Sequence, residues 1–294
     1  MKLLDSDTTW IFLSGSDEDR FLSDMLFGVK CLLHRKVPEV NILLFIDQPS
    51  GSNFVSAYGF PSGVEIFLTK ELKQQLSARN IKKIVIVVTG HGGLRGISAS
   101  PDIQPYPLLA TIKSLSNIEV ALVVLGQCYA GTFNFLEARS QDSTGQILPP
   151  EVCFLGATDL TYSVSITVDI SSQPIAAQIN SPLQWNANLF LLFFMLQVAD
   201  PIDYDGDNRF SVLDAYKASG IGTNAELLQV KRNALLSFQQ SVVDSTVSRI
   251  IQQTSVTQQL LQKAQQDLIT ASNAILTNQS PWILHANLAR KLEL

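Results

Sequence analysis

Five short apolar runs in the first 160 residues, each followed by a segment with a different pattern, constrain the fold most. Val, Ile, Leu and Phe fill both alternating positions of these runs, so each run is expected to be a strand buried on both faces. Helix-like segments at 21–35, 71–77 and 107–116 lie between them. The predicted strands are 9–15, 40–47, 81–90, 120–126 and 151–159.

This alternation predicts an α/β fold over residues 1–223, a three-layer sandwich with a mostly parallel central sheet. Residues 185–199 are apolar nearly all round and are predicted to form a buried helix packed on the sheet. The most apolar part of this segment, residues 187–199, is too short to span a bilayer, so no membrane association is expected.

The last part of the chain, residues 224–294, is predicted to be a helical extension. Residues 224–277 contain no Gly or Pro, Gln is frequent, and the apolar residues keep a helical period, which favours a long helix or a helical hairpin. Residues 224–279 are therefore candidates for binding a regulatory protein, for self-association or for covering a site. One loose heptad seam contains Leu236, Val243, Val247, Ile250, Leu261, Leu268 and Ile275.

Charge and cysteine content exclude several classes of function. The net charge of −5 disfavours nucleic-acid binding, because phosphate contacts require a basic surface. The acidic turn 14–19 after the first predicted strand disfavours a nucleotide-binding protein, since it would repel phosphate. Three cysteines are too few for a disulfide framework, and no signal peptide is recognisable at the start. We therefore expect a reduced, cytoplasmic protein.

Reactive side chains follow two of the predicted strands. His91 lies in Thr-Gly-His-Gly-Gly after the third strand, and Cys128 lies in Gly-Gln-Cys-Tyr-Ala-Gly after the fourth. Ligands of open α/β sheets bind at the carboxyl ends of the strands, and a thiol needs a neighbouring base to act as a nucleophile. Gly92 would let a substrate approach and would direct its N–H at an oxyanion. Taken singly, each motif also fits an ordinary turn or a buried core thiol.

The pair VVTGHGG and ALVVLGQCYAG resembles the caspase-like cysteine peptidases, and is closest to their legumain-like branch. The resemblance covers about residues 10–216. It implies Cys128 as nucleophile, His91 as general base and acid, and the N–H groups of Gly92 and Cys128 as the oxyanion hole. Gln127 matches the Gln of the caspase motif, although the glycine follows one place later. The implied activity is that of an intracellular cysteine endopeptidase that forms an acyl-enzyme and needs no cofactor.

The resemblance also implies substrate-binding residues. The stretch FLGATDLTYS is similar to the metacaspase segment that selects Arg or Lys before the scissile bond. Asp159 would then be a buried counter-charge for the basic side chain, with Gln127 and Ser163 beside it. Alternatively, Asp159 caps a turn after the strand. Peptidases of this fold are commonly inactive until a loop is cut, and the polar loop 138–147, which contains Arg139, is a candidate.

An acidic loop at 203–214 resembles a calcium-binding EF-hand loop. Carboxylates occupy its first, third, fifth and twelfth positions, as Asp203, Asp205, Asp207 and Asp214. Asn208 stands where glycine is usual, and Asp214 is shorter than the customary Glu, so the predicted Ca²⁺ site is weak. The alternative is an acidic turn before a helix N-capped by Ser211.

Alternatives to the peptidase remain open at this stage. The α/β part could be a catalytically inactive caspase-like scaffold that acts through the C-terminal helices, or a non-proteolytic acyl transferase. Cys31 and Cys153 lie in apolar segments and are expected to be core residues.

Overall fold

The structure, a computed structural model, describes residues 1–47, 59–178, 183–250 and 255–294. Only the backbone is described for residues 178, 244–250, 255–258, 260, 261 and 276. The chain forms two compact units: the first contains Met1–Ile221 and Ser280–Leu294, and the second contains Gly222–Gln279.

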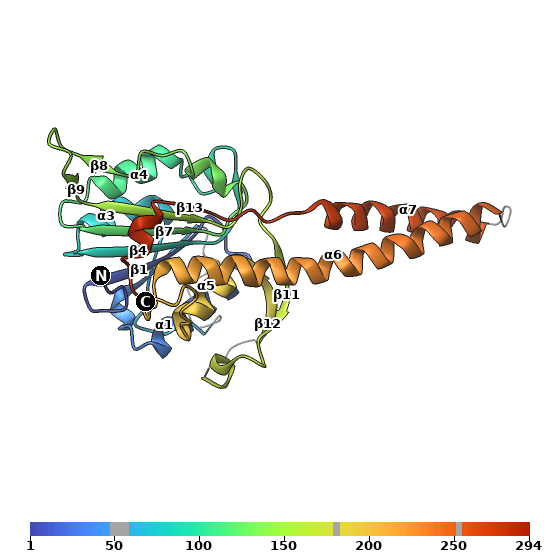
Figure 1. Cartoon of the computed structure of the whole chain (residues 1–294), viewed down its shortest axis with the longest axis horizontal. Coiled ribbons are helices and arrows are strands. Elements are labelled where there is room, and N and C mark those ends of the chain that lie inside the picture. Colours follow the sequence, from blue (N-terminus) through green and yellow to red (C-terminus); the bar gives the residue numbers. More distant parts are fainter. Residues whose placement is uncertain (48–58, 179–182, 251–254) are drawn as a thin grey trace. The chain divides into compact units, whose positions relative to one another are not determined.

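A seven-stranded sheet is the centre of the first unit (Figure 1). Its order is β13-β10-β7-β4-β1-β2-β3, and every neighbouring pair is parallel except β10 with β13. The predicted α/β fold with a mostly parallel sheet is confirmed. The strands are β1 (Thr8–Ser14), β2 (Ile42–Ile46), β3 (Glu65–Phe67), β4 (Lys83–Val88), β7 (Val120–Leu125), β10 (Glu151–Gly156) and β13 (Trp282–Leu284).

Helices cover both faces of this sheet (Figure 1). On one face, α1 (Asp19–His34) and α5 (Leu189–Ala199) share a core with Val85 and Val87 of β4. On the other face, α3 (Leu72–Ser77) and α4 (Pro105–Lys113) share a second core with the alternating residues of the same strand. Each central strand is thus buried on both sides, which explains why the apolar residues of these strands do not alternate with polar ones.

The predicted helix at 185–199 begins later than expected. Residues Gln184–Asn188 form strand β12, which pairs antiparallel with β11 (Ser165–Asp169). Asn188 then acts as the N-cap of α5, because its side-chain oxygen accepts a hydrogen bond from the Leu191 N–H at 3.1 Å. Within the described residues, no helix combines the length and the apolar character that crossing a membrane requires.

The C-terminal part differs from the predicted extension of 224–294. Helix α6 (Val212–Ile250) starts in the first unit, and the hairpin that it forms with α7 (Ser255–Leu276) ends at Gln279. The last fifteen residues return to the first unit as β13 and α8 (Ala286–Ala289). There β13 pairs with β10, and the Val212 N–H donates to the Leu292 carbonyl at 2.8 Å. The helical hairpin is therefore an insertion between two parts of the α/β unit.

The hairpin buries a narrow set of side chains. Leu227 of α6 and Ala264 and Ala271 of α7 are buried, and Lys231 Nζ donates to Asn278 Oδ1 at 2.6 Å. The predicted seam is wrong at Leu236 and Val243, which are exposed. Leu268 and Ile275 are half-buried, whereas the side chains of Val247, Ile250 and Leu261 lie outside the described residues.

Candidate functional site

The register of β4 and β7 brings the two predicted reactive residues to one edge of the sheet. Val88 pairs with Leu125, the last residues of their strands, so His91 and Cys128 each lie three residues beyond paired positions. The two segments touch at Gly92, where a Cβ atom would overlap the Cys128 carbonyl oxygen and the Gln127 side chain. Only glycine fits this approach, which explains the residue that follows the histidine.

His91 is held by the start of helix α1. Its Nε2 lies 2.5 Å from Glu18 Oε1, and its ring meets the Phe21 ring edge-on at 5.1 Å. When Nε2–H donates to Glu18, the neutral ring keeps its free lone pair on Nδ1. The His91 side chain is 52% exposed, so the ring as a whole is open to solvent.

Glu18 is a site residue that the sequence did not reveal. Partial burial acts to raise its pKa, but the hydrogen bond and charge of His91 and the charge of Arg20 outweigh this and lower the pKa below its usual value. Arg20 Nε bonds to Glu18 Oε2 at 3.0 Å. A lowered pKa keeps Glu18 anionic, so its carboxylate accepts the hydrogen bond that orients the imidazole. The only signal in the sequence is a carboxylate shortly after the first strand.

Cys128 lies in a turn that a neighbouring loop holds in place. Tyr129 has φ of 56°, and its N–H donates to the Thr161 carbonyl at 2.8 Å. The Gly131 N–H donates to the Asp159 carbonyl at 3.0 Å, and the Ser163 N–H approaches Cys128 Sγ at 3.4 Å. The loop 157–163 thus contacts the turn at three points. We call this loop, residues 157–163, the loop cradle.

Cys128 is the one cysteine of the three that reagents can reach. Its side chain is partly exposed, whereas Cys31 and Cys153 are fully buried in the core, as the sequence predicted. Burial raises the pKa of both buried thiols far above the ordinary value. Neither buried thiol is therefore available as a nucleophile near neutral pH.

The three predicted substrate-binding residues lie beside Cys128 but differ in setting. Asp159 is exposed rather than buried, and its Oδ1 accepts a hydrogen bond from Thr161 Oγ1 at 2.9 Å, so the carboxylate caps a turn. Gln127 is 1% exposed, and neither atom of its amide has a hydrogen-bond partner within the described residues. Ser163 contacts Cys128 through its backbone, as described above.

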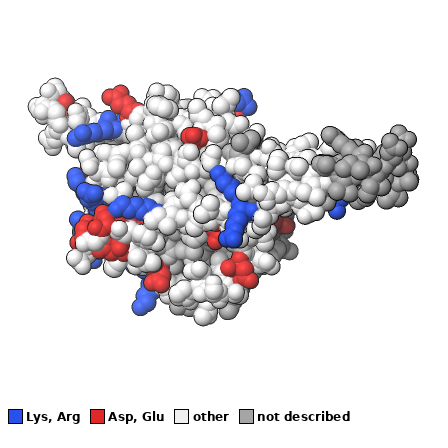
Figure 2. All heavy atoms as spheres, turned by 45° about the vertical axis from the view of Figure 1, so that its right-hand side comes forward, with Lys and Arg blue, Asp and Glu red and all other residues white. Residues whose placement is uncertain are grey.

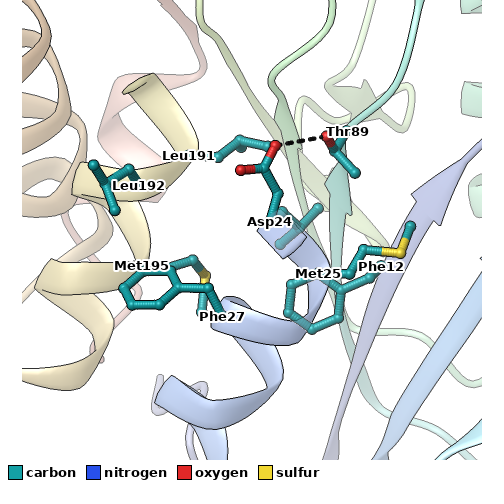
Figure 3. A pocket seen from close by; sticks show the side chains of 9 residues that line it. Phe12, Asp24, Met25, Phe27, Thr89, Leu191, Leu192 and Met195 are labelled. Atoms are coloured by element: carbon teal, nitrogen blue, oxygen red, sulfur yellow. Dashed lines mark hydrogen bonds between the residues drawn. The ribbon is translucent and has the colours of Figure 1, made fainter. Parts of the chain in front are cut away.

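Asp24 is a buried carboxylate that the sequence did not single out (Figure 3). It accepts hydrogen bonds from Thr89 Oγ1 at 3.0 Å, from Trp185 Nε1 at 3.1 Å and from the Asn188 N–H at 3.2 Å. Burial raises its pKa to about 7, although these bonds and Arg20 oppose the shift. The adjoining cavity, lined by apolar side chains such as Met25, measures about 10 Å³, room for about one water molecule.

Asn188 connects this buried carboxyl to the loop cradle. Its Nδ2 donates to the Gly126 carbonyl at 2.7 Å and to Ser163 Oγ at 3.0 Å, while its backbone N–H donates to Asp24. A short chain of hydrogen bonds therefore runs from Asp24 through Asn188 and Ser163 to Cys128. This chain fixes the end of β7 relative to α1, α5 and the loop cradle.

Next to Cys128 the structure offers an edge on which a peptide could lie. In the described part of the chain, β11 pairs with β12 alone, so its other edge has no strand beside it. This strand starts at Ser165, two residues after Ser163. Two exposed apolar side chains lie close in sequence to the two segments of the site: Leu94 follows the His91 segment, and Tyr162 lies against Tyr129 with ring centroids 5.6 Å apart.

The acidic loop at 203–214 brings three of its four predicted ligands together. One carboxylate oxygen each of Asp203, Asp205 and Asp214 lies within 4.8 Å of the others, and Asp207 is not part of this group. Asn208 has φ of 62°, the left-handed conformation that glycine usually provides there. Asp214 Oδ2 also accepts the Ser211 hydroxyl at 2.6 Å, and the Asp214 N–H donates to Ser211 Oγ at 3.2 Å, so Ser211 caps α6 as well. The loop is compatible with a hard cation and with a simple helix cap.

Comparison of the chain with models of known protein families gives no match, and a search of curated proteins also finds none.

Proposed function

We propose that the protein is a caspase-like cysteine endopeptidase in which Cys128 is the nucleophile and His91 is the general base and acid. The observation that carries the proposal is the matched register of β4 and β7, which places both residues at one sheet edge with Gly92 against the Cys128 backbone. A partly exposed thiol and an oriented imidazole at the same sheet edge are the two groups that nucleophilic catalysis requires.

The chemistry follows from these positions. His91 Nδ1 takes the thiol proton, and the sulfur attacks the carbonyl carbon of the scissile peptide bond. The N–H groups of Gly92 and Cys128 stabilise the oxyanion. The C–N bond then breaks, the amine leaves with the proton from His91, and a thioester remains on Cys128. A water molecule, deprotonated by His91, attacks the thioester, and release of the acid restores the thiol. Glu18 stabilises the imidazolium in both halves.

The free edge of β11 supports a peptide rather than a small ester as substrate. A peptide that pairs with this edge runs past Cys128, because β11 follows directly after the segment that contacts the sulfur. Tyr162 and Leu94 are then available for side chains of the substrate. The test is hydrolysis of a panel of fluorogenic peptides that differ in the residue before the scissile bond, compared between wild type and Cys128→Ala.

Cleavage after Arg or Lys is the proposed specificity, with Asp159 as the contact for the basic side chain. Since Asp159 is exposed, its charge is screened by water, and Asp159→Asn is expected to lower kcat/KM for Arg peptides by only about three- to fivefold. Hydrolysis of the matching Ala peptide, measured side by side, is the control and should not change. A wild-type preference for Asp or Asn peptides would contradict Asp159 as the residue that selects the substrate.

Free thiols indicate a reducing compartment, and we propose a cytoplasmic location.

The strand pair β8 (Ser140–Gln141) and β9 (Ile147–Leu148) forms an antiparallel ladder directly after Arg139, which is exposed. We propose this hairpin as the place where the enzyme is cut during activation.

A second function, self-association, is favoured by an exposed apolar stripe on α6. Ile221, Leu228, Leu235 and Val242 are exposed and follow each other at intervals of seven residues. This is the repeat of helices that supercoil with a partner helix. The four side chains carry no charge, so an apolar surface such as the same stripe of a second copy suits them. On the face that Figure 2 draws, few charged side chains lie on the part of the hairpin that is not grey. A regulatory protein with an apolar helix is the alternative partner.

We expect the wild-type protein to sediment as a dimer or larger species at micromolar concentration, and Leu228→Glu with Leu235→Glu to sediment as a monomer, because four charges at the seam of a dimer repel. Sedimentation velocity provides the measurement. The control is Asn233→Glu with Ser237→Glu, which adds the same charge at exposed positions off the stripe. A wild-type monomer would rule out self-association and leave the regulatory partner.

Calcium binding by the acidic loop is a further proposal, with a structural role. Ca²⁺ is expected to raise the melting temperature of metal-stripped protein, and Asp203→Asn with Asp205→Asn should abolish the increase, because two of three clustered carboxylates are neutralised. Asp142→Asn, in a turn that also holds backbone N–H groups, is the matched control. Titration calorimetry that gives no heat with Ca²⁺ would show that the loop is only a helix cap.

A further inference from the structure

Trp282 is joined to the loop cradle although it lies more than 150 residues from Cys128 in the sequence. Its indole N–H donates to the Thr158 carbonyl at 2.8 Å, and Trp282 pairs with Gly156 across the β10–β13 ladder. A Cβ atom on Gly156 would overlap the indole ring, so only glycine leaves space for it. Trp282 is buried and thus clamps the first residues of the loop to the sheet.

The contact continues from Thr158 to the nucleophile turn. Thr158 Oγ1 lies 2.8 Å from Thr161 Oγ1, and the Thr161 carbonyl accepts the Tyr129 N–H, the residue after Cys128. Two residues later, the Ser163 N–H contacts Cys128 Sγ. The position of the sulfur therefore depends on a loop whose beginning is fastened by Trp282 and whose end is fastened by Asn188.

Trp282 also stands three residues after Gln279, the last residue of the hairpin insertion. Tyr216 Oη donates to the Pro281 carbonyl at 3.0 Å and so fastens the residue that precedes Trp282. Strand β13, which follows the hairpin in the sequence, therefore begins with the residue that donates to Thr158 of the loop cradle.

We propose that Trp282 is a positioning residue for Cys128. The proposal rests on the proposed function for its catalytic meaning, but the reactivity of Cys128 can be measured without a substrate.

The test compares two tryptophan variants that lose the same kind of bond. Trp282→Phe removes the indole donor to Thr158, and Trp10→Phe removes the buried indole donor to the Leu3 carbonyl, a bond of 3.0 Å at the opposite end of the sheet. Each protein is treated with iodoacetamide, and the alkylation rate of Cys128 is measured by mass spectrometry. Turnover of the best peptide is measured in parallel.

Trp282→Phe is expected to slow alkylation of Cys128 about tenfold, the scale of one buried hydrogen bond, and to lower kcat by a similar factor with KM unchanged. Trp10→Phe should change the alkylation rate and kcat by less than about twofold, because the bond from Trp10 to the Leu3 carbonyl contributes to the stability of the fold and does not contact the loop cradle. Tyr216→Phe removes only the hydroxyl that donates to the Pro281 carbonyl, and it should slow alkylation of Cys128 about threefold. This variant replaces Trp282→Phe in the test if Trp282→Phe does not fold.

Equal effects of Trp282→Phe and Trp10→Phe, or no effect of Trp282→Phe on alkylation, would overturn the positioning role. Slower alkylation in Trp282→Phe together with no peptide hydrolysis by wild type would support the positioning role and reject the peptidase. The two proposals therefore fail in different measurements.

Discussion

Cys128→Ala is expected to reduce peptide hydrolysis to background, a loss of at least about 10⁴-fold in kcat, because no other group can form the acyl-enzyme. His91→Ala should cause a loss of similar size, since the two residues act as one unit. Glu18→Gln keeps the contact to His91 but removes its charge, so we expect a smaller loss, about tenfold in kcat. Initial rates with saturating fluorogenic peptide provide the measurement.

The other cysteine variants are the control for this series. Cys31→Ala should leave kcat within about twofold, because the residue is buried in the core among α1 and the sheet and acts only through packing. Activity that survives in Cys128→Ala, or an equal loss in Cys31→Ala, would show that the thiol of Cys128 does not perform the reaction.

Asp24 is expected to make the stability of the fold depend on pH. Its pKa is about 7 in the folded protein and about 3.8 as a model value, so the folded state holds the proton over a range where the unfolded chain has released it. The associated stability is fully present below about pH 4 and is lost as pH rises through about 7, a change on the order of 4 kcal/mol. Arg20 is the charged group that acts on Asp24, and it limits this loss.

Asp24→Asn tests this directly, because asparagine is isosteric with the protonated acid and can donate to Thr89 while it accepts from Trp185. We expect the variant to be more stable than wild type at pH 8 and to show little change between pH 5 and pH 8. Asp24→Ala should lose about 2–4 kcal/mol at pH 5, because it leaves the buried donors of Trp185 and Asn188 without an acceptor. Urea unfolding at several pH values measures both.

Asp159→Asn serves as the matched control, since its carboxylate is exposed. Parallel stability curves for wild type and Asp24→Asn across this pH range would contradict the assignment of a proton to Asp24 in the folded protein.

The sheet could be predicted from the sequence because its strands are buried on both faces. A run such as 84–88 is apolar at every position, and this pattern does not depend on distant partners. Strands β12 and β13 could not be found in this way. The Gln184–Asn188 segment is identified as a strand only by its partner β11, and Trp282–Leu284 is too short to separate from a loop until β10 is seen beside it.

The residues of the candidate site likewise divide into those that a sequence pattern locates and those that only the folded chain brings together. His91 and Cys128 follow predicted parallel strands, so a general rule about strand ends locates them. Glu18 meets His91 across 73 residues, and Asp24 meets Trp185 across 161, and neither distance leaves a pattern in the sequence. The exposure of Asp159 depends on the path of the loop cradle, which hydrogen bonds to the turn 129–131 determine.

Intact-mass analysis after treatment with a peptidyl acyloxymethyl ketone tests the central claim most directly. The account predicts one adduct per chain on Cys128, formed by wild type and not by His91→Ala, with Cys31 and Cys153 unmodified. Labelling that is equally fast in His91→Ala, or that is spread over the three cysteines, would contradict a nucleophile activated at the shared edge of β4 and β7.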